Sequence, residues 1–214
     1  MFKKAFVAFA LLVSAFSAQA SILLLSEHFD DVSTLPGWVL LNQSTPGGLT
    51  GWFQGNDGIF VAQSGADNAY IAANFNNAGR DVSGASTLNN WLITPTFSTE
   101  NAGQVSFWAR HDVDISFDDF FTFGLSNGSA DPLNFTVGNL VQANTEWTQY
   151  TLNFAANGAG SVGRFAINYL GDADTSNYIG FDTVTITAVP EPSSWMLIGI
   201  GALGLLSLRR RQQR

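Results

Sequence analysis

The sequence predicts an all-β protein whose centre is a jelly-roll-like antiparallel β-sandwich. Short apolar runs, rich in β-branched and aromatic residues, recur between clusters of Gly, Asn, Asp, Ser and Thr. No long segment repeats with the period of an amphipathic helix. About ten such runs follow one another at the separations that are typical of a sandwich. A further segment of different composition lies at each end of the chain.

The apolar runs define the expected strands. In the first half of the domain these are 22–29, 38–41, 52–54, 59–62 and 70–75. Strands 52–54 and 59–62 are expected to pair across the turn-forming residues 55–58. A polar loop over 76–88 comes next.

The second half of the domain contains six expected strands. They are 91–94, 105–110, 120–125, 147–154, 163–170 and 178–186, and residues 131–144 are less regular. Val105, Phe107 and Ala109 alternate with Ser106, Trp108 and Arg110, which predicts a strand with the first three residues on one face.

The first 20 residues have the three parts of a secretory signal peptide. Lys3 and Lys4 precede an apolar run over 5–16, and Ala18-Gln19-Ala20 supplies the small residues of a cleavage site for signal peptidase. We therefore assign 1–20 as a signal peptide, so that the mature chain begins at Ser21. An uncleaved N-terminal membrane helix is the alternative, and the short apolar run disfavours it.

The last part of the chain, 188–214, predicts a single marginal transmembrane helix. Pro190 and Pro192 precede an uncharged stretch of 16 residues over 193–208, which Arg209, Arg210 and Arg211 follow. As a helix the stretch spans about 24 Å, against a bilayer core of about 30 Å, so it needs tilt or bilayer thinning to fit. The arginines keep their end in the cytoplasm. A buried helix of a soluble domain is the alternative, and it is disfavoured because the stretch is apolar all round.

This end of the chain resembles the PEP-CTERM sorting signal of Gram-negative bacteria that make exopolysaccharide. The resemblance rests on the motif Val189-Pro190-Glu191-Pro192, the apolar segment 193–208 and the basic tail 209–214. It implies processing by an exosortase, a membrane protease or transpeptidase that recognises the motif. The protein would then be anchored transiently in the membrane and end at the outer surface or in the extracellular matrix.

The central domain is far more acidic than the whole chain. Six of the 9 basic residues and one of the 17 acidic residues lie in the two end segments, which leaves 3 basic and 16 acidic residues and a net charge of −13. Such a surface repels nucleic acid, which excludes a nucleic-acid partner, and it suits cations, neutral glycans or simple solubility. The chain has no cysteine, which excludes disulfides, a thiol nucleophile and cysteine metal ligands.

A second resemblance covers most of the domain, 21–187. The chain resembles the choice-of-anchor J domain, which is related to cleaved-adhesin modules of bacterial surface proteases and more distantly to MAM-type jelly rolls. The motifs that carry it are Phe29-Asp30, Leu35-Pro36-Gly37-Trp38, Gly51-Trp52, Asn90-Trp91-Leu92-Ile93-Thr94-Pro95, Phe107-Trp108, Trp147-Thr148-Gln149-Tyr150 and Tyr178-Ile179-Gly180-Phe181-Asp182. The resemblance implies a β-sandwich on varied surface anchors and no agreed activity.

Structural Ca²⁺ is the one cofactor that the sequence favours. Calcium takes six to eight oxygen ligands, and the first and last strands of a jelly roll often lie side by side, which would bring Asp30 and Asp182 together. Related adhesin modules hold calcium near these strands. Glu27 and Asp31 are further candidate ligands. The alternative is that Asp30 and Asp31 shape the turn into Leu35-Pro36 and that Asp182 forms hydrogen bonds with a neighbouring loop.

Trp52 is the candidate for stacking on a sugar ring. It lies between loops rich in Gly and Asn, and an exposed indole is a good platform for a sugar face. The alternative is that Trp52 is a core or corner residue of the sandwich.

Catalytic residues are not expected. His28 and His111 are the only histidines, and both are predicted to lie at strand ends on the surface. Asp172, Asp174 and Ser176 have the spacing that opens an EF-hand loop, but Asn177 and Thr183 replace its Gly and Glu, so a solvated turn is expected. The leading interpretation is therefore a non-enzymatic surface or matrix protein, associated with exopolysaccharide or biofilm. A carbohydrate-binding adhesin and an extracellular hydrolase are the alternatives.

Overall fold

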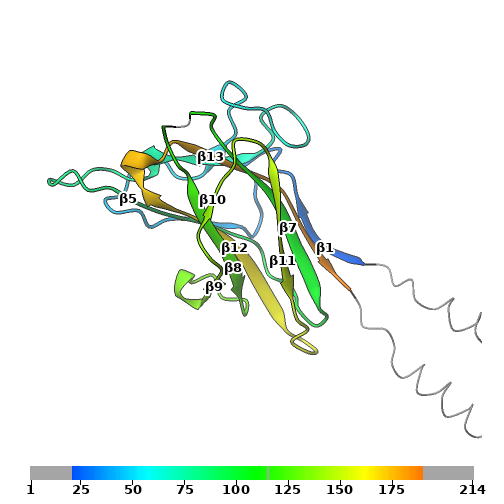
Figure 1. Ribbon diagram of the computed structural model, residues 1–214. Helices are drawn as coiled ribbons and strands as arrows, with labels where there is room; N and C mark the ends of the chain where they lie inside the picture. The colour runs from blue at the N-terminus through cyan, green and yellow to red at the C-terminus, as the bar shows by residue number, and fades with distance from the viewer. Residues whose placement is uncertain (1–20, 115, 190–214) are drawn as a thin grey trace, which may run out of the picture. The chain divides into compact units, whose positions relative to one another are not determined.

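The computed structural model describes residues 21–114 and 116–189. Within these residues the strands form two antiparallel sheets that pack on each other, so the prediction of an all-β sandwich is confirmed (Figure 1). The predicted signal peptide, 1–20, and the predicted membrane segment, 193–208, lie outside the described residues. Inside them, no helix has the length and apolar character needed to cross a membrane.

The first sheet has six strands within the described part of the chain, in the order β11-β7-β13-β4-β3, with β1 beside β13. Their bounds are β1 Ile22–Glu27, β3 Phe53–Gln54, β4 Ile71–Asn74, β7 Gly103–His111, β11 Thr148–Phe154 and β13 Tyr178–Ala188.

The second sheet has seven strands in the same described residues, in the order β10-β8-β12-β5-β2, with β6 beside β12 and β9 beside β8. Their bounds are β2 Val39–Asn42, β5 Thr87–Ile93, β6 Phe97–Ser98, β8 Phe120–Ser126, β9 Thr136–Val137, β10 Val141–Gln142 and β12 Val162–Asp172. From β4 to β13, the strands of four or more residues alternate between the two sheets.

Aromatic rings fill the space between the sheets. Val105, Phe107 and Ala109 of β7 are fully buried, as their alternation predicts. Phe121 and Phe165 of the second sheet face Phe107 with ring centroids 6.1 and 5.4 Å away. Burial of one such side chain stabilises the fold by about 1.5–3 kcal/mol, so this cluster is a main source of cohesion between the sheets.

The segment 55–69 covers the outer face of the first sheet without forming a strand. The predicted strand 59–62 is wrong, because the N–H groups of Ile59 and Phe60 donate to the Asn56 carbonyl at 3.0 and 3.3 Å and turn the chain. Phe60 then stacks on Tyr70 with centroids 5.0 Å apart and is 4% exposed. Burial of this ring against the sheet replaces the expected ladder.

Three short 3₁₀ helices occur in the described residues: η1 (Phe75–Asn77), η2 (Pro132–Asn134) and η3 (Ala173–Thr175). Two of them, η1 and η3, lie in neighbouring parts of the domain and contribute residues to one pocket. The expected polar loop over 76–88 thus begins inside a helical turn and ends inside β5.

Candidate functional site

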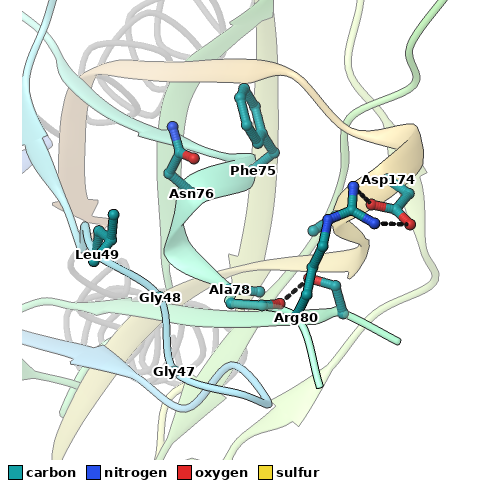
Figure 2. Close-up of a pocket in the computed structure, with 11 residues that line it drawn as sticks. Gly47, Gly48, Leu49, Phe75, Asn76, Ala78, Arg80 and Asp174 are labelled. Atoms are coloured by element: carbon teal, nitrogen blue, oxygen red, sulfur yellow. Dashed lines mark hydrogen bonds and ion pairs between the residues drawn. The ribbon is translucent and has the colours of Figure 1, made fainter. Parts of the chain in front are cut away.

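A pocket with a volume of about 360 Å³ opens beside η1 (Figure 2). Its lining comes from residues that are far apart in the sequence, namely 47–49, 75–76, 78–80, Ser86 and 173–174. Volumes of about 300–1,000 Å³ are usual for sites that bind small molecules. In Figure 2, Leu49 lies on one side of the pocket and the paired side chains of Arg80 and Asp174 lie on the other.

Backbone hydrogen bonds hold the two loops that form one wall of the pocket. The N–H groups of Gly48 and Leu49 donate to the carbonyls of Asn77 and Asn76 at 3.0 and 2.9 Å. A Cβ on Gly48 would overlap the Asn76 carbonyl oxygen, so only glycine permits this close approach. The wall is therefore built from main chain and has a defined shape.

Amide and hydroxyl side chains support the wall from behind. Asn77 is fully buried, and its side-chain amide lies 2.7 Å from the Thr50 hydroxyl. With its amide nitrogen turned toward Thr50 and the Asn74 carbonyl, Asn77 donates to both groups, and its amide oxygen accepts from Asn90 Nδ2. Asn74 also caps η1 by accepting the Asn76 N–H at 3.0 Å, and Asn42 donates to the Asn77 carbonyl at 2.7 Å. These hydrogen bonds tie η1 to the segments around Asn42 and Thr50.

Arg80 and Asp174 form a bidentate ion pair at the pocket, although 94 positions separate them. Arg80 Nη1 donates to one carboxylate oxygen at 2.9 Å, and Nη2 pairs with the other oxygen. The side chains are 65% and 40% exposed. Solvent screens such a pair, so it adds little to stability, and its planar array of donors and acceptors faces water.

Two exposed apolar side chains complete the lining. Leu49 is 97% exposed and Phe75 is 42% exposed. The pocket thus combines apolar surface with the Asn76 amide and one compensated pair of charges. The charged groups of its lining are the Asp174 carboxylate and the Arg80 guanidinium.

Trp52, the predicted sugar platform, is half-buried. Its Nε1–H donates to the Trp91 carbonyl at 2.9 Å, and its ring meets Phe181 edge-on at 5.9 Å. These contacts make Trp52 a packing residue between the two sheets. Stacking of a glycan on Trp52 stays a prediction. The pocket beside η1 leaves more apolar surface exposed than Trp52 does.

The four predicted calcium ligands do not gather into one site. Among the described residues no group of three or more His, Asp or Glu side chains is placed to hold a metal. One Glu27 oxygen accepts the backbone N–H groups of His28 and Phe29 at 3.1 and 2.9 Å. Asp31 bonds the N–H and hydroxyl of Ser33 at 2.9 and 2.6 Å, as the turn alternative predicts.

Asp30 and Asp182 both lie beside the segment 63–65. Asp182 is fully buried, and one of its oxygens accepts the N–H groups of Gln63 and Ser64 at 2.9 and 3.1 Å. Its other oxygen accepts the N–H and hydroxyl of Thr183 at 2.6 and 3.1 Å. Four hydrogen bonds from backbone N–H and hydroxyl groups therefore occupy both oxygens of the Asp182 carboxylate, as the loop-bonding alternative predicts.

Burial raises the pKa of Asp182 from its ordinary 3.8 to about 6, and the four hydrogen bonds hold the pKa down against this effect. The neighbouring Thr183 has a positive φ of 49°, at a register shift between β13 and β7. The register shift that follows Asp182 is a β-bulge. The Asp182 carboxylate holds the segment 63–64 on the sheet through its hydrogen bonds to Gln63 and Ser64.

One histidine does not lie where the sequence predicts. His28 is exposed and contacts Ser26 Oγ at 3.2 Å, in line with the prediction. His111, at the end of β7, is 6% exposed, and its Nδ1 lies 3.7 Å from Asp119 Oδ2. Burial raises the pKa of Asp119, which also accepts the Tyr169 hydroxyl at 2.6 Å. The prediction that His111 lies on the surface is wrong, because it packs over this buried carboxylate.

The EF-hand-like run folds as the solvated turn that was predicted. Asp172 caps η3 by accepting the Asp174 N–H at 2.9 Å, and Asp174 pairs with Arg80. Of the sorting motif only Val189 is described. Pro190, Glu191, Pro192, the segment 193–208 and Arg209, Arg210 and Arg211 lie outside the described residues.

The comparisons with known proteins support the assignment of the tail. A family model described as the PEP-CTERM protein-sorting motif matches residues 188–211. No curated protein matches the chain. The motif implies export and a surface or extracellular location in a Gram-negative bacterium.

Solved structures with the same fold include two domains of Lys-gingipain from Porphyromonas gingivalis W83. The K3 cleaved adhesin domain is 21% identical, with a TM-score of 0.59 over 78% of this chain and 99% of that chain. The K1 domain is 22% identical, with a TM-score of 0.57 over 77% and 97%. The chain thus carries a PEP-CTERM motif and a domain with the fold of cleaved adhesin domains.

A cyclase from Fischerella sp. TAU is similar as well, with a TM-score of 0.50 and 15% identity over 80% of this chain and 98% of that chain. Because adhesin domains and an enzyme share the fold, the fold by itself does not decide between binding and catalysis. The narrower assignment to choice-of-anchor J stays a prediction.

The pocket escaped the sequence analysis. Arg80 and Asp174 give no local signal, since their pairing depends on the contact of η1 with η3. The one available hint in the sequence was Gly48, a position where a Cβ would overlap the Asn76 carbonyl oxygen.

Proposed function

We propose that this protein is a non-enzymatic surface or matrix protein that an exosortase sorts and that associates with extracellular polysaccharide. The observation that carries the proposal is the sorting motif, whose family model matches residues 188–211. The adhesin-like fold is compatible with a binding role, and the pocket beside η1 has the chemistry of a binding site.

The charge of the domain favours a neutral polymer as the partner. With a net charge of −13, the central domain repels acidic polymers and anionic lipid surfaces. The chain has no cysteine, so the domain holds its fold outside the cell without disulfides. Its processing partners are signal peptidase at residues 1–20 and exosortase at 189–192, and the segment 193–208 anchors the chain in the membrane until the tail is cut.

Sorting is tested by following a tagged protein in strains with and without exosortase. We expect the tail to be removed and the protein to reach the surface fraction only when exosortase is present. Glu191→Ala, which removes the carboxylate of the motif, is expected to reproduce the deletion phenotype. Glu146→Ala, at an exposed acid of the domain, is the control and is expected to leave processing unchanged. An uncut, membrane-bound protein in both strains would refute the proposal.

Structural calcium stays a separate proposal from the sequence. Asp30 is exposed, and its Oδ1 lies 3.3 Å from where a Cβ on Gly65 would be, next to the segment 63–64 that Asp182 bonds. Thermal unfolding in chelator and in millimolar calcium decides the question. A calcium concentration of 100 times the dissociation constant would add about 2.7 kcal/mol to the free energy of unfolding. Equal melting midpoints in the two solutions would show that the domain does not bind calcium.

A further inference from the structure

We propose that the pocket beside η1 binds a neutral saccharide segment, with Leu49 and Phe75 against the carbon face of a sugar ring and Arg80 and Asp174 on its hydroxyls. The inference rests on the proposed function and names the ligand class and the site. It assigns the sugar contact to this pocket instead of Trp52.

The apolar contribution comes from two side chains that the fold leaves uncovered. Leu49 is 97% exposed and Phe75 is 42% exposed, and both line the same pocket (Figure 2). A sugar ring presents C–H groups on its faces and hydroxyls on its rim. Apolar side chains and an aromatic ring gain from covering such a face, since they lose their contact with water.

The polar contribution comes from groups whose charges already compensate each other. Arg80 and Asp174 hold each other in a fixed fork, and their exposed edges offer donors and acceptors to adjacent hydroxyls. The exposed Asn76 adds an amide to the lining. A site built to bond hydroxyls discriminates strongly against ligands that lack them. This combination distinguishes a saccharide from an apolar peptide segment, which would leave the fork unused.

The pocket is preorganised, which lowers the cost of binding. The Gly48 and Leu49 N–H groups donate to the carbonyls of Asn77 and Asn76 in η1 at 3.0 and 2.9 Å. The side chain of Asn77, the last residue of η1, is fully buried. The main chain of this wall therefore loses little freedom when a ligand arrives.

Electrostatics selects a neutral ligand over an acidic one. Arg80 is the one basic residue of the lining, and Asp174 occupies it. Asp81 directly follows Arg80, and Asp172 lies two residues before Asp174. The domain as a whole carries a net charge of −13. A carboxylated, sulfated or phosphorylated sugar would meet uncompensated repulsion at this rim.

The test uses the full chain in a sugar-free zwitterionic detergent, titrated with neutral gluco-, manno- and galacto-oligosaccharides and with oligogalacturonate as the acidic probe. Saturation-transfer NMR and calorimetry report binding. We expect at least one neutral probe to bind and oligogalacturonate not to bind. Phe75→Ala and Asp174→Asn are each expected to weaken the neutral probe about tenfold, the loss of one stacking contact or one charge-assisted hydrogen-bond pair.

Matched controls separate the pocket from general effects. Asp57→Asn makes the same charge change as Asp174→Asn at an exposed position outside the pocket, and Leu133→Ala truncates a side chain that is 92% exposed on η2. Both controls are expected to bind like the wild type. Circular dichroism melting of each variant confirms folding, and Arg80→Gln provides a second probe of the fork if Asp174→Asn is unstable.

Three results would overturn the assignment. They are no binding of any neutral probe by the wild-type chain, binding of oligogalacturonate alone, and wild-type affinity in all the pocket variants. If the pocket variants bind normally while exosortase-dependent sorting holds in cells, the inference fails and the proposed function stands. If sorting is independent of exosortase while neutral sugars bind at the pocket, the proposed function fails instead.

Discussion

Raising the pH from about 4 to about 7 is expected to weaken the fold through Asp182. This carboxyl is fully buried, and burial raises its pKa from 3.8 to about 6. The folded chain therefore holds the Asp182 proton more tightly than the unfolded chain does. The resulting stability is fully present below the unfolded pKa of 3.8 and is lost as the pH rises through about 6. The interval between the two pKa values corresponds to about 3 kcal/mol.

Other carboxyls either reinforce this trend or act at lower pH. Burial raises the pKa of Asp119, so its contribution has the same sign. Hydrogen bonds from Ser33 and Ser83 lower the pKa values of Asp31 and Asp81. The stability from these two is present above their unfolded pKa of 3.8 and is lost only at more acidic pH. The window between about 4 and about 6 thus reports the buried carboxyls.

The assay is urea unfolding of the full chain, followed by tryptophan fluorescence at several pH values between about 4 and about 7. Asp182→Asn has no titrating group at this position. Between pH of about 4 and about 7, its free energy of unfolding is therefore expected to fall by about 3 kcal/mol less than that of the wild type. Asp57→Asn, at an exposed site, controls for net charge and is expected to keep the wild-type pH dependence. The reasoning is refuted if Asp182→Asn and the wild type share one pH dependence, or if the wild type gains stability across this window.

Three further predictions concern the core and the pocket. Phe107→Ala removes the ring at the centre of the sandwich and is expected to lower the free energy of unfolding by about 3–5 kcal/mol in urea, and a loss below about 1 kcal/mol would contradict the packing described. Gly48→Ala is expected to cost about 1–3 kcal/mol because its Cβ overlaps the Asn76 carbonyl, whereas Gly47→Ala, which meets open space, serves as the matched control. Asp174→Asn is expected to shift the free energy of unfolding by less than about 1 kcal/mol, since the ion pair is exposed, and a larger loss would make it a structural residue.

Sequence patterns predicted the strands well where one face of a strand is buried in the sandwich. The alternation around Phe107 holds because inward and outward side chains of a half-buried strand differ in polarity. The same method failed for 59–62, where Phe60 is buried against the outer face of a sheet and not in a ladder. An apolar run signals burial, but it does not say whether the main chain bonds to a strand or to its own turn.

The candidate site was less accessible to sequence reasoning than the fold. Trp52 was selected for its type and its loop context, yet an indole N–H finds a partner when it is buried, here the Trp91 carbonyl at 2.9 Å. Asp182 was correctly expected to meet a neighbouring loop, as the alternative to calcium. The pocket was missed because its segments lie far apart in the sequence, and the EF-hand-like spacing at Asp174 predicted only a solvated turn.

The sequence by itself determined the all-β class, the acidity of the domain and the PEP-CTERM motif at 188–211. These properties follow from composition, local periodicity and short linear motifs, each of which one stretch of chain contains completely. Only the tertiary structure decided that Arg80 meets Asp174, that Leu49 and Phe75 share one pocket and that Asp182 is buried. The physical reason is that β-sandwich strands pair with partners remote in sequence, so the contacts of their connecting loops depend on the whole topology.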